Sequence, residues 1–314
     1  MTDFDTRIAR INDVLCAVNA LEWDARVMMP PGGAETRGHQ VATLKGLARE
    51  MILDPALADA AASARDSADA RTRAAGDASV TELCEIAAKR GLMVDMHCDE
   101  TDDPMSRHIE TLCRETLRLG LQGRVAASHL TSMHVMDNYY ASKLIPLIAE
   151  SEITVIPSPL TNIAAWGKNN GSYPKWRGIT RVPELLEADV TVAFGQDCVM
   201  DPWYAYGCAD MLEVAHMGSH ITAMFGVDQV SACFDAITVS PAQILLLEDY
   251  GLDPGCHADM IVLQAADPLE AIRLKARRLA VIRRGKIIAR TAPTVTELSL
   301  PGRPNILELT YRPV

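Results

Sequence analysis

Short apolar runs alternate with segments of helical periodicity from residue 79 onward, and this alternation restricts the fold more than any other feature of the chain. The strand candidates are the runs at residues 93–97, 125–128, 153–157 and 190–194. The segments between them have helical periodicity and cover residues 105–119, 139–150 and 183–188. Strands and helices that alternate at this spacing indicate successive βα units. The sequence therefore predicts an α/β fold with a parallel sheet.

Polar residues follow each of the predicted strands. His97 and Glu100 come at the end of the first strand, His129 at the end of the second, Asn162 after the third and Asp197 after the fourth. In an α/β barrel, catalytic groups collect at the carboxyl ends of the strands. Two histidines and an aspartate at successive strand ends are typical of a metal-assisted hydrolase site. For the first strand taken alone, a surface strand end with ordinary acidic residues explains the pattern equally well.

The two ends of the chain differ from this α/β region. Apolar residues at spacings of three and four predict helices at residues 4–27 and 41–51, and an alanine-rich third helix follows from 55 to about 75. After the last strand candidate, helices are predicted over roughly 205–225, 227–237 and 241–247. Short strands at 258–263, 279–283 and 286–289 then predict a small β appendage. We therefore expect a helical segment at 1–75, the α/β region at 76–250, and the β appendage with the tail at 251–314.

Composition narrows the class of protein and of partner. Hydrophobic residues make up 48% of the 314 residues, which is ample for a core. No apolar run is long enough to span a membrane, and the acidic N-terminus lacks the features of a signal peptide. The eight cysteines are scattered, which is typical of reduced thiols in a cytoplasmic protein. A formal net charge of −11 argues against a nucleic-acid partner and favours a small, roughly neutral substrate.

Two further sets of polar residues are expected to have structural roles. Asp99, Asp102 and Asp103 form an acidic loop after the first strand, and most of these carboxylates are predicted to be solvated. His216 and His220 lie four residues apart on a predicted helix, so they face the same way. A metal pair is one interpretation, and packing of the helix on the barrel is the favoured one.

The N-terminal quarter resembles a known family. The stretch Leu21-Glu22-Trp23-Asp24, the stretch from Met28-Met29-Pro30-Pro31-Gly32-Gly33 to Arg37, and Gln40 are similar to the N-terminus of the carboxypeptidase Taq family. Those proteins are all-helical metallopeptidases, and the resemblance covers about residues 1–70. The family's H-E-x-x-H helix has no counterpart in this sequence, so peptide hydrolysis is the least favoured function.

A second resemblance covers residues 79 to about 290. The stretches that carry it are His97-Cys98-Asp99-Glu100, Ala127-Ser128-His129 with Met133-His134, Tyr173-Pro174-Lys175 with Arg177-Gly178-Ile179-Thr180-Arg181-Val182, and Phe194-Gly195 with Asp197 and Asp201-Pro202-Trp203-Tyr204. They are similar to the C-terminal half of the cytosine deaminase family in the amidohydrolase superfamily. The resemblance implies an α/β fold of a specific kind: a partial (β/α)8 barrel that holds strands five to eight of the superfamily.

The resemblance also implies roles for individual residues. His97 would be a metal ligand, and Asp197 would bind the metal and take a proton from the attacking water. His129 would orient and polarise the hydroxide, and Glu100 would carry protons to the ring nitrogen of the pyrimidine. Trp203 would form a wall of the substrate pocket. The implied cofactor is one divalent metal ion, iron or zinc, which brings the pKa of a bound water to near neutrality.

Cys198 departs from the family pattern, because cytosine deaminases commonly carry a second aspartate after the metal-binding one. Cysteine is smaller and less polar, so we expect more room beside the fifth position of the substrate ring. This predicts that the parent enzyme accepts 5-substituted cytosines, such as 5-methylcytosine, as well as or better than cytosine. A neutral packing substitution explains the same residue equally well, and cytosine, isocytosine or another amino-substituted ring stays open as a substrate.

The superfamily's His-x-His pair, which supplies two metal ligands on the first strand, has no counterpart here. We interpret the sequence as a junction near residues 70–80 between fragments of two unrelated enzymes. The remaining ligand set, His97 and Asp197 with His129 nearby, is incomplete for a tight metal site, and half a barrel also leaves open strand edges. The isolated chain is therefore expected to bind metal weakly and to deaminate little. The alternative is a non-catalytic fragment that needs a partner chain, and a homo-oligomer is one form of such an assembly.

Overall fold

The computed structural model describes residues 3–27, 32–167, 173, 175–201 and 203–303. The chain forms two compact units, Met1–Ala75 and Gly76–Val314. Residues 28–31, 174 and 202, which belong to the stretches that carry the two resemblances, lie outside the described residues. In the part of the chain that the structure describes, every helix is too short or too polar to span a bilayer.

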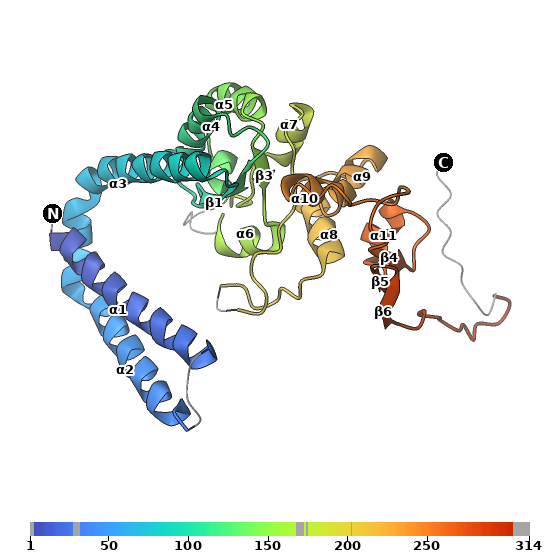
Figure 1. Cartoon of the computed structure of the whole chain (residues 1–314), viewed down its shortest axis with the longest axis horizontal. Coiled ribbons are helices and arrows are strands. Elements are labelled where there is room, and N and C mark those ends of the chain that lie inside the picture. The colour runs from blue at the N-terminus through green and yellow to red at the C-terminus, as the bar shows by residue number, and fades with distance from the viewer. Residues whose placement is uncertain (1–2, 28–31, 168–172, 174, 202, 304–314) are drawn as a thin grey trace. The chain divides into compact units, whose positions relative to one another are not determined.

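The first unit is a helical hairpin of α1 (Asp3–Val27) and α2 (Ala34–Leu53), followed by the start of α3 (Pro55–Arg90) (Figure 1). Among the residues of these two helices whose burial is described, Ile11, Val18 and Ala48 are buried and apolar. Asp54 separates α2 from α3 because its backbone is extended and its carboxylate accepts a 2.9 Å hydrogen bond from the backbone N–H of Ala56. The helices predicted at residues 4–27, 41–51 and 55–75 are confirmed. The third is longer than predicted, since α3 continues through Gly76 without a break.

Three parallel strands form the central sheet of the second unit: β1 (Val94–Cys98), β2 (Val125–His129) and β3 (Thr154–Ile156), in that order. His97 pairs with Ser128 and Cys98 with His129, so β1 and β2 end at the same level. The predicted α/β class and parallel strands are therefore confirmed.

The fourth predicted strand, at residues 190–194, forms only an isolated parallel bridge between Val155 and Val192. The N–H of Ala193 donates to the Val155 carbonyl at 3.0 Å, which keeps the segment alongside β3. The next N–H, that of Phe194, donates instead to the carbonyl of Ala236 at 2.8 Å. The segment leaves the sheet at this point, which is why the predicted strand is shorter than its apolar run.

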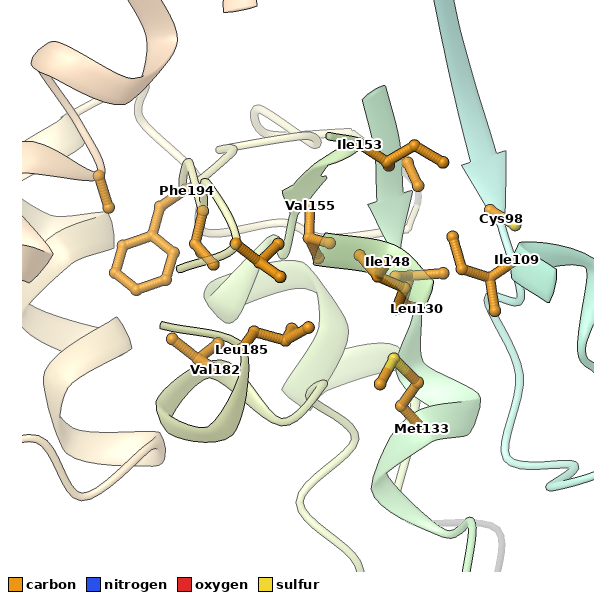
Figure 2. Close-up of a cluster of buried hydrophobic side chains, with 14 of the residues drawn as sticks. Cys98, Ile109, Leu130, Met133, Ile148, Ile153, Val155, Val182, Leu185 and Phe194 are labelled. Carbon is orange, nitrogen blue, oxygen red and sulfur yellow. The ribbon is translucent and has the colours of Figure 1, made fainter. Parts of the chain in front are cut away.

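A single apolar core joins the sheet to its helices. The helices that contribute to this core include α4 (His108–Leu119), α5 (Asn138–Glu150) and α7 (Val182–Glu187). Figure 2 shows side chains of this core, which include Ile109, Ile148, Val155 and Leu185 from these elements and Phe194 from the segment after β3. Gly120 ends α4 in a left-handed conformation with φ 66°, where its N–H reaches the last carbonyls of the helix.

The remaining helices of this unit follow the sheet. They are the 3₁₀ turn Thr131–His134 and the helices α6 (Pro159–Ala165), α8 (Met211–Ile221), α9 (Val227–Asp235), α10 (Val239–Ile244) and α11 (Pro268–Leu274). α8 to α10 confirm three predicted helices with shorter bounds, whereas α6 and α11 were not predicted. Both begin with proline at the first helical position, which is a common start of a helix. Each has only seven residues, too few for a clear periodic pattern of apolar residues.

The C-terminal strands β4 (Met260–Leu263), β5 (Arg278–Arg283) and β6 (Lys286–Arg290) form an antiparallel sheet (Figure 1). Arg284 and Gly285 make the turn between β5 and β6 with positive φ angles of 49° and 73°. This sheet belongs to the same compact unit as β1 to β3. Arg278 of β5 donates a 2.7 Å hydrogen bond to Asp210, whose side chain caps α8, so this bond joins the antiparallel sheet to α8.

Candidate metal centre and active site

Three side chains from separate segments converge at the carboxyl ends of the parallel strands. His97 lies on β1, His129 is the last residue of β2, and Asp197 follows the segment beside β3. One potential ligand atom from each residue lies within 4.8 Å of the other two. The imidazole rings of His97 and His129 have centroids 4.7 Å apart. Among the described residues, this is the group of histidine and carboxylate side chains whose spacing suits a metal ion.

The backbone is strained at two of these three positions. His129 has a φ of 73° and Asp197 a φ of 62°, and residues other than glycine are uncommon in this left-handed region. Leu130 continues the strain at φ 50°, and its N–H donates to the carbonyl of Cys98 at 3.1 Å. Such strain persists where surrounding contacts enforce it, and it concentrates at functional sites. Ten other described non-glycine residues also have a positive φ, so this backbone geometry describes the cluster but does not by itself identify it as functional.

His129 is buried, with 1% of its surface exposed. Its Nδ1 lies 2.9 Å from the side-chain nitrogen of Asn162. Its Nε2 lies 3.7 Å from a carboxylate oxygen of Glu100 and has no hydrogen-bond partner within the described parts of the chain. Burial lowers the pKa of His129, and the charges of Glu100 and Asp197 oppose this shift only in part. The imidazole is therefore neutral near pH 7.

Glu100 is held beside this cluster by an aromatic residue. The indole N–H of Trp166, which ends α6, donates to Oε1 of Glu100 at 3.0 Å. The chain just after Trp166 touches the segment 176–178 directly, because a Cβ added to Gly167 would lie 2.3 Å from the carbonyl oxygen of Trp176. No motif in the sequence pointed to Trp166, since it lies after a short helix that was not predicted.

Cys198 is buried next to Asp197, with its Sγ 3.7 Å from a carboxylate oxygen of that residue. Burial is the main reason that the pKa of the Cys198 thiol rises to about 11, so the side chain is a neutral thiol at pH 7. The role expected for Trp203 as a wall of the substrate pocket stays a prediction. Its side chain is 79% exposed, and its backbone N–H donates to Asp201 at 3.0 Å. The indole of Trp166, by contrast, contacts the site residue Glu100.

The acidic loop after β1 was expected to be mostly solvated, and Asp99 is the exception: Asp103 is exposed and Asp102 is half-buried. Asp99 is buried rather than solvated, and its carboxylate accepts hydrogen bonds from the backbone N–H groups of His108 and Ile109 at 3.0 and 2.9 Å. Burial alone would raise the pKa of Asp99, but the hydrogen bonds from His108, Ile109 and Ser106 outweigh it and lower the pKa. Asp102 accepts from the N–H of Gly167 at 2.9 Å. The loop that carries Glu100 is therefore fixed at both α4 and the end of α6.

The pair His216 and His220 lies apart from this cluster in the chain. Their rings have centroids 4.4 Å apart on α8, and Nδ1 of His216 lies 3.2 Å from the carbonyl oxygen of Ile272 in α11. These contacts agree with the predicted role in helix packing.

Comparison with known proteins places the chain in a family. The model of the amidohydrolase family matches residues 9–289, so the chain belongs to this family. This match begins at residue 9, whereas the resemblance to cytosine deaminases begins at residue 79. The similarity of the first 70 residues to the carboxypeptidase Taq family stays a prediction.

Two relatives of known sequence have the names of a deaminase and of an amidohydrolase. The pterin deaminase of Rhizobium rhizogenes is 33% identical over 223 residues, which are 71% of this chain and 51% of the relative. The N-isopropylammelide isopropyl amidohydrolase of a Pseudomonas species is 26% identical over 67% of this chain and 49% of the relative.

Two solved structures that resemble this chain also have the names of a deaminase and an aminohydrolase. The 5-methylcytosine deaminase of Klebsiella pneumoniae, liganded with 5-fluorocytosine, is 40% identical with a TM-score of 0.68 over 72% of this chain and 55% of that chain. The N-isopropylammelide isopropylaminohydrolase of Burkholderia multivorans is 27% identical with a TM-score of 0.60 over 68% of this chain and 52% of that chain. The chain thus spans about half the length of the proteins it matches. Its kinship with deaminases that act on C–N bonds is confirmed.

Proposed function

We propose that the chain carries the catalytic half of a hydrolytic deaminase that acts on cytosine-like pyrimidines. The observation that carries this proposal is the convergence of His97, His129 and Asp197 within 4.8 Å, with Glu100 beside them. The kinship with 5-methylcytosine deaminase and pterin deaminase supports the reaction class, because both names describe removal of an amino group.

The donor set fits a divalent metal ion. Imidazole nitrogen and carboxylate oxygen are ligands that suit zinc and iron, and His97 and Asp197 are the residues that would hold the ion. The buried Nε2 of His129, which lacks a hydrogen-bond partner within the described residues, supports the presence of a further polar group there. When bound, such an ion lowers the pKa of water toward neutrality and so supplies a nucleophile.

The remaining steps belong to side chains of this chain. Asp197 would accept a proton from the attacking water, and a C–O bond would form at the ring carbon that bears the amino group. Glu100 would pass a proton to the adjacent ring nitrogen and would then take the proton of the new C–OH group, while Asp197 would deliver the proton it took from water to the departing amine. The C–N bond breaks, and ammonia leaves. The Trp166 indole, 3.0 Å from Glu100, would hold that carboxylate in place through this exchange.

Cys198 favours a substrate with a group at the fifth ring position. It is buried beside Asp197 and is a neutral thiol, so it adds neither charge nor bulk to this side of the site. We therefore propose 5-methylcytosine as the preferred substrate, with cytosine and isocytosine as alternatives.

Ammonia release tests the function. The purified full chain, loaded with zinc or iron, is assayed with cytosine, 5-methylcytosine, isocytosine and pterin, and Glu100→Gln is the matched inactive control. We expect slow release above that control, with 5-methylcytosine the best substrate. Release at the level of the Glu100→Gln variant with every substrate and both metals would overturn the proposal.

A second candidate is a chain that needs a partner, either a second copy or a complementary half. Among the described strands, β1 pairs on one side only, with β2. The apolar residues Leu92 and Met93, which lead into β1, are 51% and 42% exposed. Size-exclusion chromatography with light scattering separates the candidates, because a stable monomer argues against this second one.

A further inference from the structure

Asn162 is held in one orientation by its own helix. It lies on α6 and is fully buried. Its side-chain oxygen accepts a 2.9 Å hydrogen bond from the backbone N–H of Ser158, at the start of that helix. A backbone N–H is always a donor, so the amide oxygen of Asn162 must face Ser158. Its NH₂ group must then face the opposite way.

The opposite side of Asn162 is His129. Nδ1 of that imidazole lies 2.9 Å from the Asn162 nitrogen. Because the nitrogen of Asn162 is a donor only, Nδ1 of His129 must be the acceptor and cannot carry a proton. In a neutral imidazole the proton then lies on Nε2, the atom that lies 3.7 Å from Glu100 and has no partner within the described chain. Rotating the Asn162 amide would place two donors against each other at Ser158.

We infer that Asn162 is a positioning residue that fixes His129 in the Nε2–H tautomer, so that His129 serves the site as a hydrogen-bond donor and not as a metal ligand. Ligation needs a lone pair, and the network leaves the lone pair of His129 on the side of Asn162. The role of this donor in deamination rests on the proposed function, whereas the tautomer does not. The acceptor of the Nε2–H would be an oxygen of the attacking water or of the substrate.

Nitrogen NMR of the metal-free full chain, labelled with ¹⁵N-histidine, tests the tautomer without any activity. Protonated and unprotonated imidazole nitrogens resonate in well-separated ranges, and the signals of His129 are assigned by their loss in His129→Gln. We expect an unprotonated Nδ1 and a protonated Nε2. The opposite pattern in the unmodified chain would overturn the inference, whatever the variants do.

Asn162→Asp is the decisive variant, because a carboxylate keeps the acceptor for Ser158 but replaces the donor to His129 with a second acceptor. We expect Nδ1 of His129 to become protonated. Asn138→Asp is the matched control, since the Asn138 side chain also accepts a hydrogen bond, from Arg181 at 3.0 Å, and should leave the His129 signals unchanged. An Nδ1 that stays unprotonated in folded Asn162→Asp would contradict the inference. If that variant fails to fold, the unmodified chain still decides.

Kinetics separate this inference from the proposed function. Where the chain releases ammonia, Asn162→Asp should lower kcat by about 10- to 100-fold with little change in KM, the size usual for groups that orient a site residue. An unchanged kcat would contradict the positioning role. If the unmodified chain releases none, the deaminase proposal fails, and the NMR result still stands or falls by itself.

Discussion

The buried carboxylate of Asp99 lies 2.8 Å from Nδ1 of His108 and ties the end of β1 to the first turn of α4. The same carboxylate accepts from the hydroxyl of Ser106 at 2.8 Å. Because Asp99 lies between Cys98 and Glu100 in the chain, this one side chain fixes both the strand end and the loop that carries the proposed proton carrier.

Asp99→Ala should lower the free energy of unfolding by about 3 kcal/mol, because it leaves several buried donors without an acceptor. Urea unfolding followed by circular dichroism measures this loss. Asp235→Ala is the control, since Asp235 is exposed at the end of α9, and it should change stability by less than about 0.5 kcal/mol. Equal effects of the two substitutions would show that Asp99 has no special structural role.

The Asp99 carboxylate should also make the stability of the fold depend on pH. The pKa of Asp99 is lowered in the folded state. Its ionised form therefore contributes stability that is present above the unfolded pKa of about 4 and is lost as the pH falls through the folded value. Unfolding curves between pH 7 and pH 3 should show a loss of stability at the acid end that is smaller in Asp99→Asn. Parallel pH profiles for the two proteins would contradict this.

Gly76→Ala should destabilise the chain although it adds a good helix former to α3. A Cβ at Gly76 would lie 2.3 Å from Nε2 and 2.7 Å from Cδ2 of His108, so the ring that pairs with Asp99 must move. We expect a loss of about 1–3 kcal/mol. Gly46→Ala in α2 has open space around the added methyl group and should gain about 0.5–1 kcal/mol. Thermal unfolding of both variants measures the difference, and a gain in both would contradict the contact.

Cys198→Asp should shift the substrate preference from 5-methylcytosine toward cytosine. A carboxylate in this buried position is bulkier and charged, and one methyl group in a pocket is worth about 10-fold or more in kcat/KM. The ratio of kcat/KM for the two substrates is measured before and after the substitution. An unchanged ratio would identify Cys198 as a neutral packing residue.

Metal should bind weakly, because the histidine pair of the superfamily's first strand has no counterpart in this sequence. After dialysis against zinc-containing buffer and then metal-free buffer, elemental analysis should find well under one ion per chain. His97→Ala should lower the content further, whereas His257→Ala should not, since His257 lies near Asp249 in the C-terminal region. Full occupancy of the unmodified chain would show that the present residues form a complete site.

The sequence predicted the convergence of His97, His129 and Asp197, because parallel strands place their carboxyl ends at one edge of a sheet. It did not predict the environment of those residues. Asn162 was recognised only as a polar residue after a strand, since its two hydrogen bonds depend on the short helix α6. The contact between Trp166 and Glu100 was not predicted for the same reason: Trp166 lies outside the regular periodic segments, where the pattern says little about side-chain position.

Local hydrogen bonds explain the other differences. The fourth strand is short because Phe194 bonds to Ala236, and α4 starts at His108 because Asp99 caps it. Neither partner is adjacent in sequence, so neither could be inferred from an apolar pattern.

The left-handed backbone at His129 and Asp197 has a consequence for protein engineering. Such conformations cost of order 1–3 kcal/mol each, and glycine would relieve that cost. A screen for thermal stability that does not measure activity would therefore enrich glycine at these two positions. The selected variants would be more stable but would lack the site side chains and their activity. Libraries built on this scaffold should hold both codons constant.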